Sequence, residues 1–98
     1  MARRPLRRDV PFDAKVARCV CELIERGWPI ACISLLPYPA PTCKRLQQWL
    51  SEDPEFRREF DLARIRGVNR LMTQQQVIDE IERVRAAFLH AVSDVANA

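Results

Sequence analysis

The stretch PYPAPTCKRLQQWLSEDPEFRREF, which runs from Pro37 to Phe60, determines how the rest of the chain is organised. Its prolines predict a stiff turn. Thr42 predicts the start of a short helix, because its hydroxyl can accept a backbone N–H of the first turn. Asp53 and Pro54 then predict the start of the next helix, since aspartate is a good cap and proline is favoured at the first helical position. The short helix, from Thr42 to about Ser51, is therefore bounded on both sides.

This short helix has one apolar side and one polar side. Leu46, Trp49 and Leu50 recur at helical spacing, so we expect them in the core. The other side is basic and rich in amides, which is the chemistry that meets phosphates and base edges of DNA. An ordinary solvated helix surface is the alternative. The candidate DNA-binding residues on this side are Thr42, Lys44, Arg45, Gln47 and Gln48.

The composition is that of a folded globular domain. The chain has 98 residues, of which 48% are hydrophobic and 30% are charged. This length allows one domain with a modest core, or a small domain followed by an extended helix. No apolar run approaches the roughly 18 residues that a membrane span needs, and the basic N-terminus lacks the apolar segment of a signal peptide. We therefore expect a cytoplasmic protein without a membrane partner.

Positive charge is concentrated near the N-terminus. Residues 1–50 carry nine Lys or Arg against four Asp or Glu, whereas residues 51–98 carry seven against nine. Residues 1–11 contain Arg3, Arg4, Arg7 and Arg8, and the prolines among them predict a flexible basic arm. Such arms follow the phosphate backbone of DNA or enter its minor groove. The alternative is a terminus that only improves solubility.

The remaining pattern predicts an all-α fold. Asp13 and Gly27 are a cap and a stop for a first helix over residues 13–26. A very short second helix over residues 30–36 is expected before the proline-rich turn. Followed by the helix that starts at Thr42, this order resembles a helix-turn-helix. We therefore expect a three-helix DNA-binding domain of this kind at residues 12–66.

The C-terminal part predicts one long helix, or two helices with a break between Gly67 and Thr73. Apolar residues recur there at alternating spacings of four and three, which is a heptad seam. The three-helix domain is expected to have its own core, so we expect residues 67–98 to self-associate through this seam. An intramolecular hairpin is the alternative. The seam residues are Val77, Ile81, Val84, Phe88, Ala91 and Val95.

Neither a metal site nor a catalytic site is predicted. Cys19, Cys21, Cys32 and Cys43 do not have the spacing of a zinc knuckle, and the only histidine is distant in the sequence. We expect these cysteines to act as small buried hydrophobes, with metal binding, redox chemistry or disulfides as alternatives. A chain with two glycines has no glycine-rich phosphate loop. We therefore expect a non-catalytic protein without a cofactor.

One run of residues resembles a known family. This run consists of Trp49-Leu50, Asp53-Pro54-Glu55-Phe56, Phe60 and Ala63-Arg64. The run is similar to the signature of bacteriophage terminase small subunits of the short helix-turn-helix type, in which W-L-x-x-x-P-E-F-x-x-x-Y-x-x-A-R follows the recognition helix. Leu23, Ile24 and Gly27, and the Pro41-Thr42 entry, also resemble that family. The resemblance covers residues 22–70, roughly half of the chain.

The resemblance implies a protein that recognises the DNA of a phage or prophage for packaging inside a bacterial host cell. It assigns assembly of subunits to the seam, and DNA contact to Thr42, Lys44, Arg45, Gln47 and Gln48. The implied partners are double-stranded DNA, further copies of the chain and a large terminase subunit. A helical protein-interaction module or a small transcriptional regulator is the alternative. In that module, charged residues beside the seam pair with a partner helix: Glu80, Glu82, Arg83 and Arg85.

Overall fold

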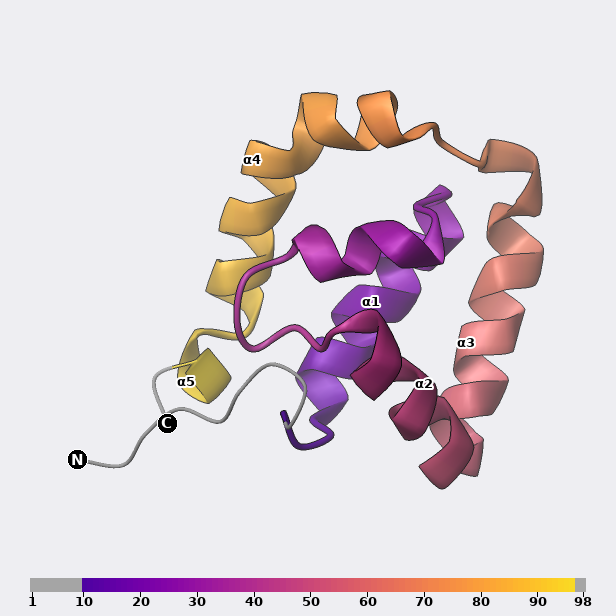
Figure 1. Cartoon of the computed structure of the whole chain (residues 1–98), viewed down its shortest axis with the longest axis vertical. Helices are drawn as coiled ribbons and strands as arrows, with labels where there is room; N and C mark the ends of the chain where they lie inside the picture. The colour runs from indigo at the N-terminus through magenta and orange to yellow at the C-terminus, as the bar shows by residue number, and fades with distance from the viewer. Residues whose placement is uncertain (1–9, 97–98) are drawn as a thin grey trace.

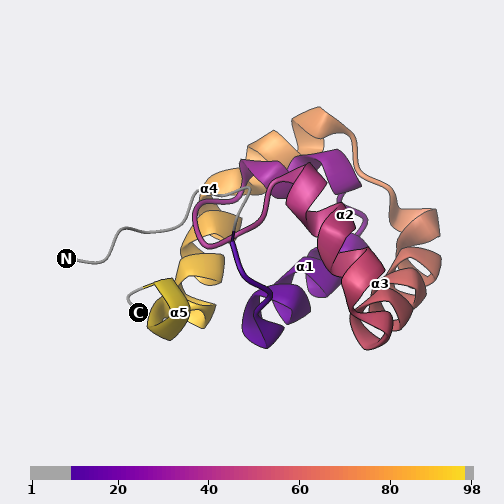
Figure 2. The ribbon, with the colours of Figure 1, turned by 60° about the horizontal axis from the view of Figure 1, so that its bottom comes forward.

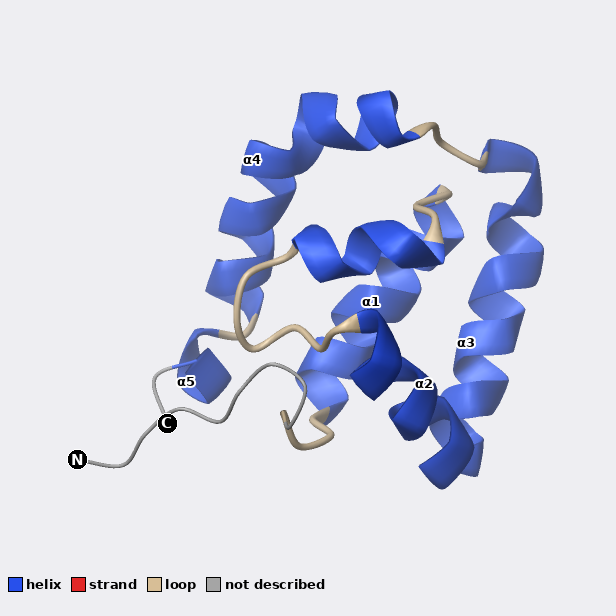
Figure 3. Ribbon diagram, in the orientation of Figure 1, coloured by secondary structure: helices blue, strands red, loops and turns tan. Residues whose placement is uncertain are grey.

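A computed structural model describes residues 10–96, and every regular element in that range is a helix, as Figure 3 shows. The elements are α1 (Ala14–Arg26), the 3-10 helix η2 (Ile30–Leu35), α2 (Cys43–Glu52), α3 (Pro54–Gly67), the 3-10 helix η3 (Val68–Arg70), α4 (Gln74–Ala91) and α5 (Ser93–Ala96). α3 and α4 lie on opposite sides of α1 (Figure 1 and Figure 2). The expected all-α class is confirmed, although the short second helix is a 3-10 helix. No helix between residues 10 and 96 is long and apolar enough to span a bilayer.

Local capping determines where the helices begin and end. The side chain of Asp13 accepts backbone N–H groups of the first turn of α1, Thr42 does the same for α2, and Asp53 for α3. Gly27 ends α1 with a φ of 108°, in the left-handed region that favours glycine. Thr73 and Gln76 form a reciprocal capping box at the start of α4. The helix starts predicted at the first three caps are confirmed.

The two glycines of the chain lie where α1 and α3 approach each other most closely. A Cβ atom on Gly67 would lie 2.3 Å from the carbonyl oxygen of Ile24, and one on Gly27 would lie 2.0 Å from that of Arg70. The N–H of Met72 donates to the carbonyl of Gly27 at 2.8 Å. Only glycine allows backbones to approach this closely, so these residues place the C-terminal ends of α1 and α3 together.

A chain of aromatic rings joins the N-terminal segment to α2 and α3. Phe12 packs edge-on against Trp49 and Phe56, with ring centroids 5.3 and 5.6 Å apart, and Phe56 packs in the same way against Phe60 at 5.9 Å. Trp49, Phe56 and Phe60 are buried, as expected. These edge-to-face contacts orient α2 on the first half of α3.

Most of the heptad seam of α4, through which residues 67–98 were expected to self-associate, packs inside the molecule, so the expectation that the three-helix domain has a core of its own is wrong. Val77, Val84 and Phe88 are 0%, 5% and 3% exposed and belong to the same core as α1, α2 and α3. Ile81 and Val95 are half-buried against that core, and Ala91 is exposed. α4 packs on α1 and η2. The boundary expected between residues 66 and 67 therefore does not separate two cores.

Replacing Gly67 with alanine tests the close approach of α1 and α3. Alanine normally stabilises a helix by about 1 kcal/mol relative to glycine. Here we expect a loss of about 1–3 kcal/mol, because the new methyl group would meet backbone rather than a movable side chain. Urea unfolding measures the change. Ala86→Gly, at an exposed position of α4, gives the ordinary difference between the two residues. A more stable Gly67→Ala protein would show that the helices are not in this contact.

Replacing Phe88 with alanine tests the intramolecular burial of the seam. We expect the variant to lose about 3–5 kcal/mol of stability, because a buried ring leaves a cavity. The loss should be the same at every protein concentration, since the chain covers the seam itself. Leu89→Ala, at the exposed neighbouring position, is the matched control. A midpoint that rises with concentration in the wild type but not in Phe88→Ala would assign the seam to self-association.

Candidate nucleic-acid interface

The polar side of α2 faces solvent, as the sequence predicts. Lys44, Gln47 and Gln48 are exposed, whereas Leu46 and Trp49 are buried beneath them. Successive helical residues are offset by about 100°, so the three polar side chains share one side of the helix. The structure thus brings together an ammonium group and two amides that are accessible from outside.

Arg45 and Thr42 make contacts within the protein. The Nε of Arg45 donates to the carbonyl of Val10 at 2.7 Å, and its Nη1 donates to the Oε1 of Gln48 at 2.8 Å. The hydroxyl of Thr42 accepts the backbone N–H of Arg45 at 3.2 Å. Thr42 is therefore a helix cap, and Arg45 is an anchor at the margin of the polar side. The guanidinium of Arg45 already donates hydrogen bonds within the protein, and the side-chain carbonyl of Gln48 already accepts one of them.

The carbonyl of Val10 belongs to the predicted arm of residues 1–11, but it is held on the fold by Arg45. It accepts a second hydrogen bond, from the Nε1 of Trp49 at 3.3 Å, and Val10 is only 2% exposed. Two donors from α2 therefore hold the chain at this residue. The predicted arm residues Arg3, Arg4, Arg7 and Arg8 lie outside the described residues, but the described chain begins beside the polar side of α2.

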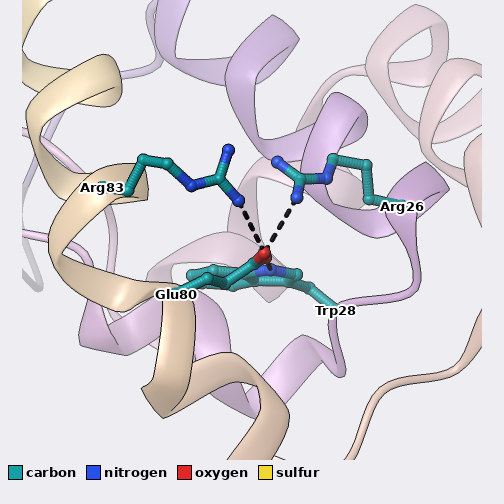
Figure 4. Close-up of polar contacts among 4 residues, drawn as sticks. All are labelled: Arg26, Trp28, Glu80 and Arg83. Atoms are coloured by element: carbon teal, nitrogen blue, oxygen red, sulfur yellow. Dashed lines mark hydrogen bonds and ion pairs between the residues drawn. The ribbon is translucent and has the colours of Figure 1, made fainter.

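A second polar cluster surrounds Glu80 of α4 and was not predicted (Figure 4). The Nε1 of Trp28 donates to one carboxylate oxygen at 2.8 Å, and the Nη2 atoms of Arg26 and Arg83 donate to the other at 2.9 and 3.0 Å. The side chain of Glu80 is 16% exposed. The cluster joins α1, the corner at Trp28 and α4. Both carboxylate oxygens of Glu80 already accept hydrogen bonds within the protein, so the role of this cluster is to hold α1 and α4 together.

The ion pairs expected with a partner helix are thus partly made inside the chain. Glu80 pairs with Arg26 and Arg83, and Arg85 donates from two nitrogens to the carbonyl of Leu35. One signal could have indicated the Glu80 contact. A tryptophan that is buried needs an acceptor for its indole N–H, and Trp28, 1% exposed, is such a residue.

The surroundings of the cysteines favour a packing role over chemical reactivity. Cys32 is buried, as expected, and the other three are half-buried. Burial raises the pKa of the Cys21 thiol to about 11, with the carboxylate of Glu59 acting in the same direction. Burial also raises the pKa of Cys19 and Cys32. Thiols held protonated are poor metal ligands and nucleophiles. In the described part of the chain, no three His, Cys, Asp or Glu side chains form a group that could hold a metal ion.

Glu80→Ala tests the structural role of this cluster. The substitution leaves the buried indole N–H of Trp28 without its acceptor, so we expect a loss of about 1–3 kcal/mol in urea unfolding. Glu80→Gln should lose less, because an amide oxygen can still accept that N–H. Glu82→Ala, at an exposed acidic residue of the same helix, should change stability by less than about 0.5 kcal/mol. Equal effects at Glu80 and Glu82 would contradict the role assigned to the cluster.

No protein-family model, curated protein or solved structure matches this chain. The resemblance to terminase small subunits therefore depends on the signature residues themselves. In the structure, Trp49, Leu50, Phe56, Phe60 and Ala63 are all buried. The apolar part of the signature thus corresponds to the packing of α2 on α3.

Proposed function

We propose that this protein binds double-stranded DNA without catalysing a reaction, through the polar side of α2 together with the basic arm. The observation that carries the proposal is the double contact at the Val10 carbonyl. Arg45 and Trp49 hold that residue against α2, and the arginines of the predicted arm precede it in the sequence. Positive charge at both elements favours a polyanion.

Two exposed side chains of α2 have the chemistry for different parts of a duplex. Lys44 offers an ammonium group to a phosphate. Gln47 is exposed and makes no hydrogen bond to the described residues through its side chain, so its amide is available for both acceptor and donor contacts to an adenine edge. Gln48 is less suited to such a contact because Arg45 already donates to its carbonyl.

The more specific form of the proposal is a phage or prophage terminase small subunit-like protein. It is supported by the resemblance over residues 22–70 and by the succession of η2, a turn and α2, which a helix-turn-helix would require. Assembly of several copies, which this function implies, would use a surface other than the buried part of the seam at Val77, Val84 and Phe88. A gene for a large terminase ATPase next to the gene for this chain would support this form, and an unrelated neighbourhood would favour a regulator.

Salt-dependent binding to a short duplex tests DNA recognition. We expect log K to fall linearly with log salt, because bound cations displace counterions from phosphates. Lys44→Ala should reduce the slope by about one unit, and deleting residues 2–8 should reduce it by about three to four units. Gln47→Ala should change the preference among sequences while leaving the slope nearly unchanged. Fluorescence anisotropy between low and moderate salt measures all three.

Lys15→Ala is the matched control, because Lys15 is the only other lysine and its ammonium pairs with Asp94. We expect it to bind as the wild type does. No saturable binding at low salt would refute the DNA proposal. Equal effects of Lys15→Ala and Lys44→Ala would refute the assignment of the contact to α2.

A further inference from the structure

A groove of about 700 Å³ opens on the side of the molecule where α1 and α3 meet, and no residue of α2 lines it. One wall comes from the end of α1 and the corner that follows it, with Ile24, Trp28 and Ile30. The other wall comes from the second half of α3 and the segment after it, with Ile65, Val68 and Leu71. We call this the Ile65 groove.

The second wall of the Ile65 groove holds the three most exposed large apolar residues among the described part of the chain. Ile65 is 68% exposed, Leu71 is 66% exposed and Val68 is 57% exposed. Such residues scattered singly are ordinary, but a contiguous apolar patch marks a surface for a partner. Here all three line one concave site.

The segment that forms the second wall of the Ile65 groove is basic. Asp61 and Arg64 are its two charged lining residues. Asp61 is already paired, since the Nε of Arg57 donates to it at 3.1 Å. Arg64 forms no ion pair with residues 10–96, and neither do Arg66 and Arg70 of the same segment. Residues 62–71 contain no acidic side chain. A partner carrying carboxylates would therefore complement this segment.

We infer that the Ile65 groove binds an amphipathic segment of a partner protein, with apolar side chains in the groove and carboxylates toward Arg64. The exposed apolar wall argues against DNA as the occupant, because a phosphate backbone offers no apolar surface to cover it. The concave shape argues against a membrane surface. This site is separate from the proposed DNA contact on α2, and it adds a protein partner to the proposed function.

Titration of the full chain with synthetic peptides tests the inference. The probes are helical peptides of about 14 residues, or about four turns, which share one leucine stripe. One has glutamates beside the stripe, a second has lysines there, and a third keeps the glutamates but has serines in the stripe. We expect saturable binding of the glutamate peptide by calorimetry, and at least about tenfold weaker binding of the other two.

Two substitutions at exposed positions locate the contact. Ile65→Ser should weaken binding of the glutamate peptide by about tenfold or more. Arg64→Glu should reverse the preference, so that the lysine peptide binds more tightly than the glutamate peptide. Leu89→Ser, at an exposed leucine of α4, is the matched control and should bind as the wild type does. Thermal unfolding shows whether each variant is folded. If Ile65→Ser does not fold, Arg64→Glu alone decides the result.

Several outcomes would overturn the inference. They are no saturable binding of the glutamate peptide, equal binding of the glutamate and lysine peptides, or binding that neither substitution changes. Binding of the protein to vesicles that contain phosphatidylglycerol is measured as a further test. If the wild type binds them through Ile65 and binds none of the peptides, the groove is a membrane contact and the inference is wrong.

Discussion

Where the end of α1 meets the end of α3 and η3, the backbone on each side lies against a glycine of the other. Gly67 lies under the carbonyl of Ile24, and Gly27 lies under that of Arg70. Gly27 also needs its left-handed conformation to end α1. Gly27 therefore ends α1 and also leaves room for the backbone at the end of η3. This contact directs the chain out of α3 toward the far side of α1, where α4 can pack.

The position of α4 explains the interior of the molecule. Its apolar side supplies Val77, Val84 and Phe88 to the core, and Glu80 on the same helix accepts the indole N–H of Trp28. A heptad pattern specifies that one side of a helix is buried, but it does not specify what buries it. In this chain of 98 residues, α1 and η2 supply that cover. The assumption that the first three helices would complete their own core made self-association seem necessary.

Features that depend on neighbouring residues were predictable from the sequence. The caps at Asp13, Thr42 and Asp53, the stop at Gly27 and the outward direction of Lys44 all follow from contacts within a few positions. The contact of Arg45 with Val10 and that of Glu80 with Trp28 join residues 35 and 52 positions apart. Such pairs depend on how whole helices pack, so local patterns do not reveal them. This is why Arg45 was predicted as a DNA contact and is observed as an anchor.

α3 connects the two surfaces to which functions are proposed. Its first half packs through Phe56 against Trp49 of α2, and its second half carries Ile65 of the groove. The surfaces share no lining residue, so a partner in the groove would not cover Lys44 or Gln47. They also differ in chemistry, since one is polar and the other is mainly apolar. A single helix packed on both α1 and α2 would then hold a partner bound in the groove in a defined orientation relative to α2.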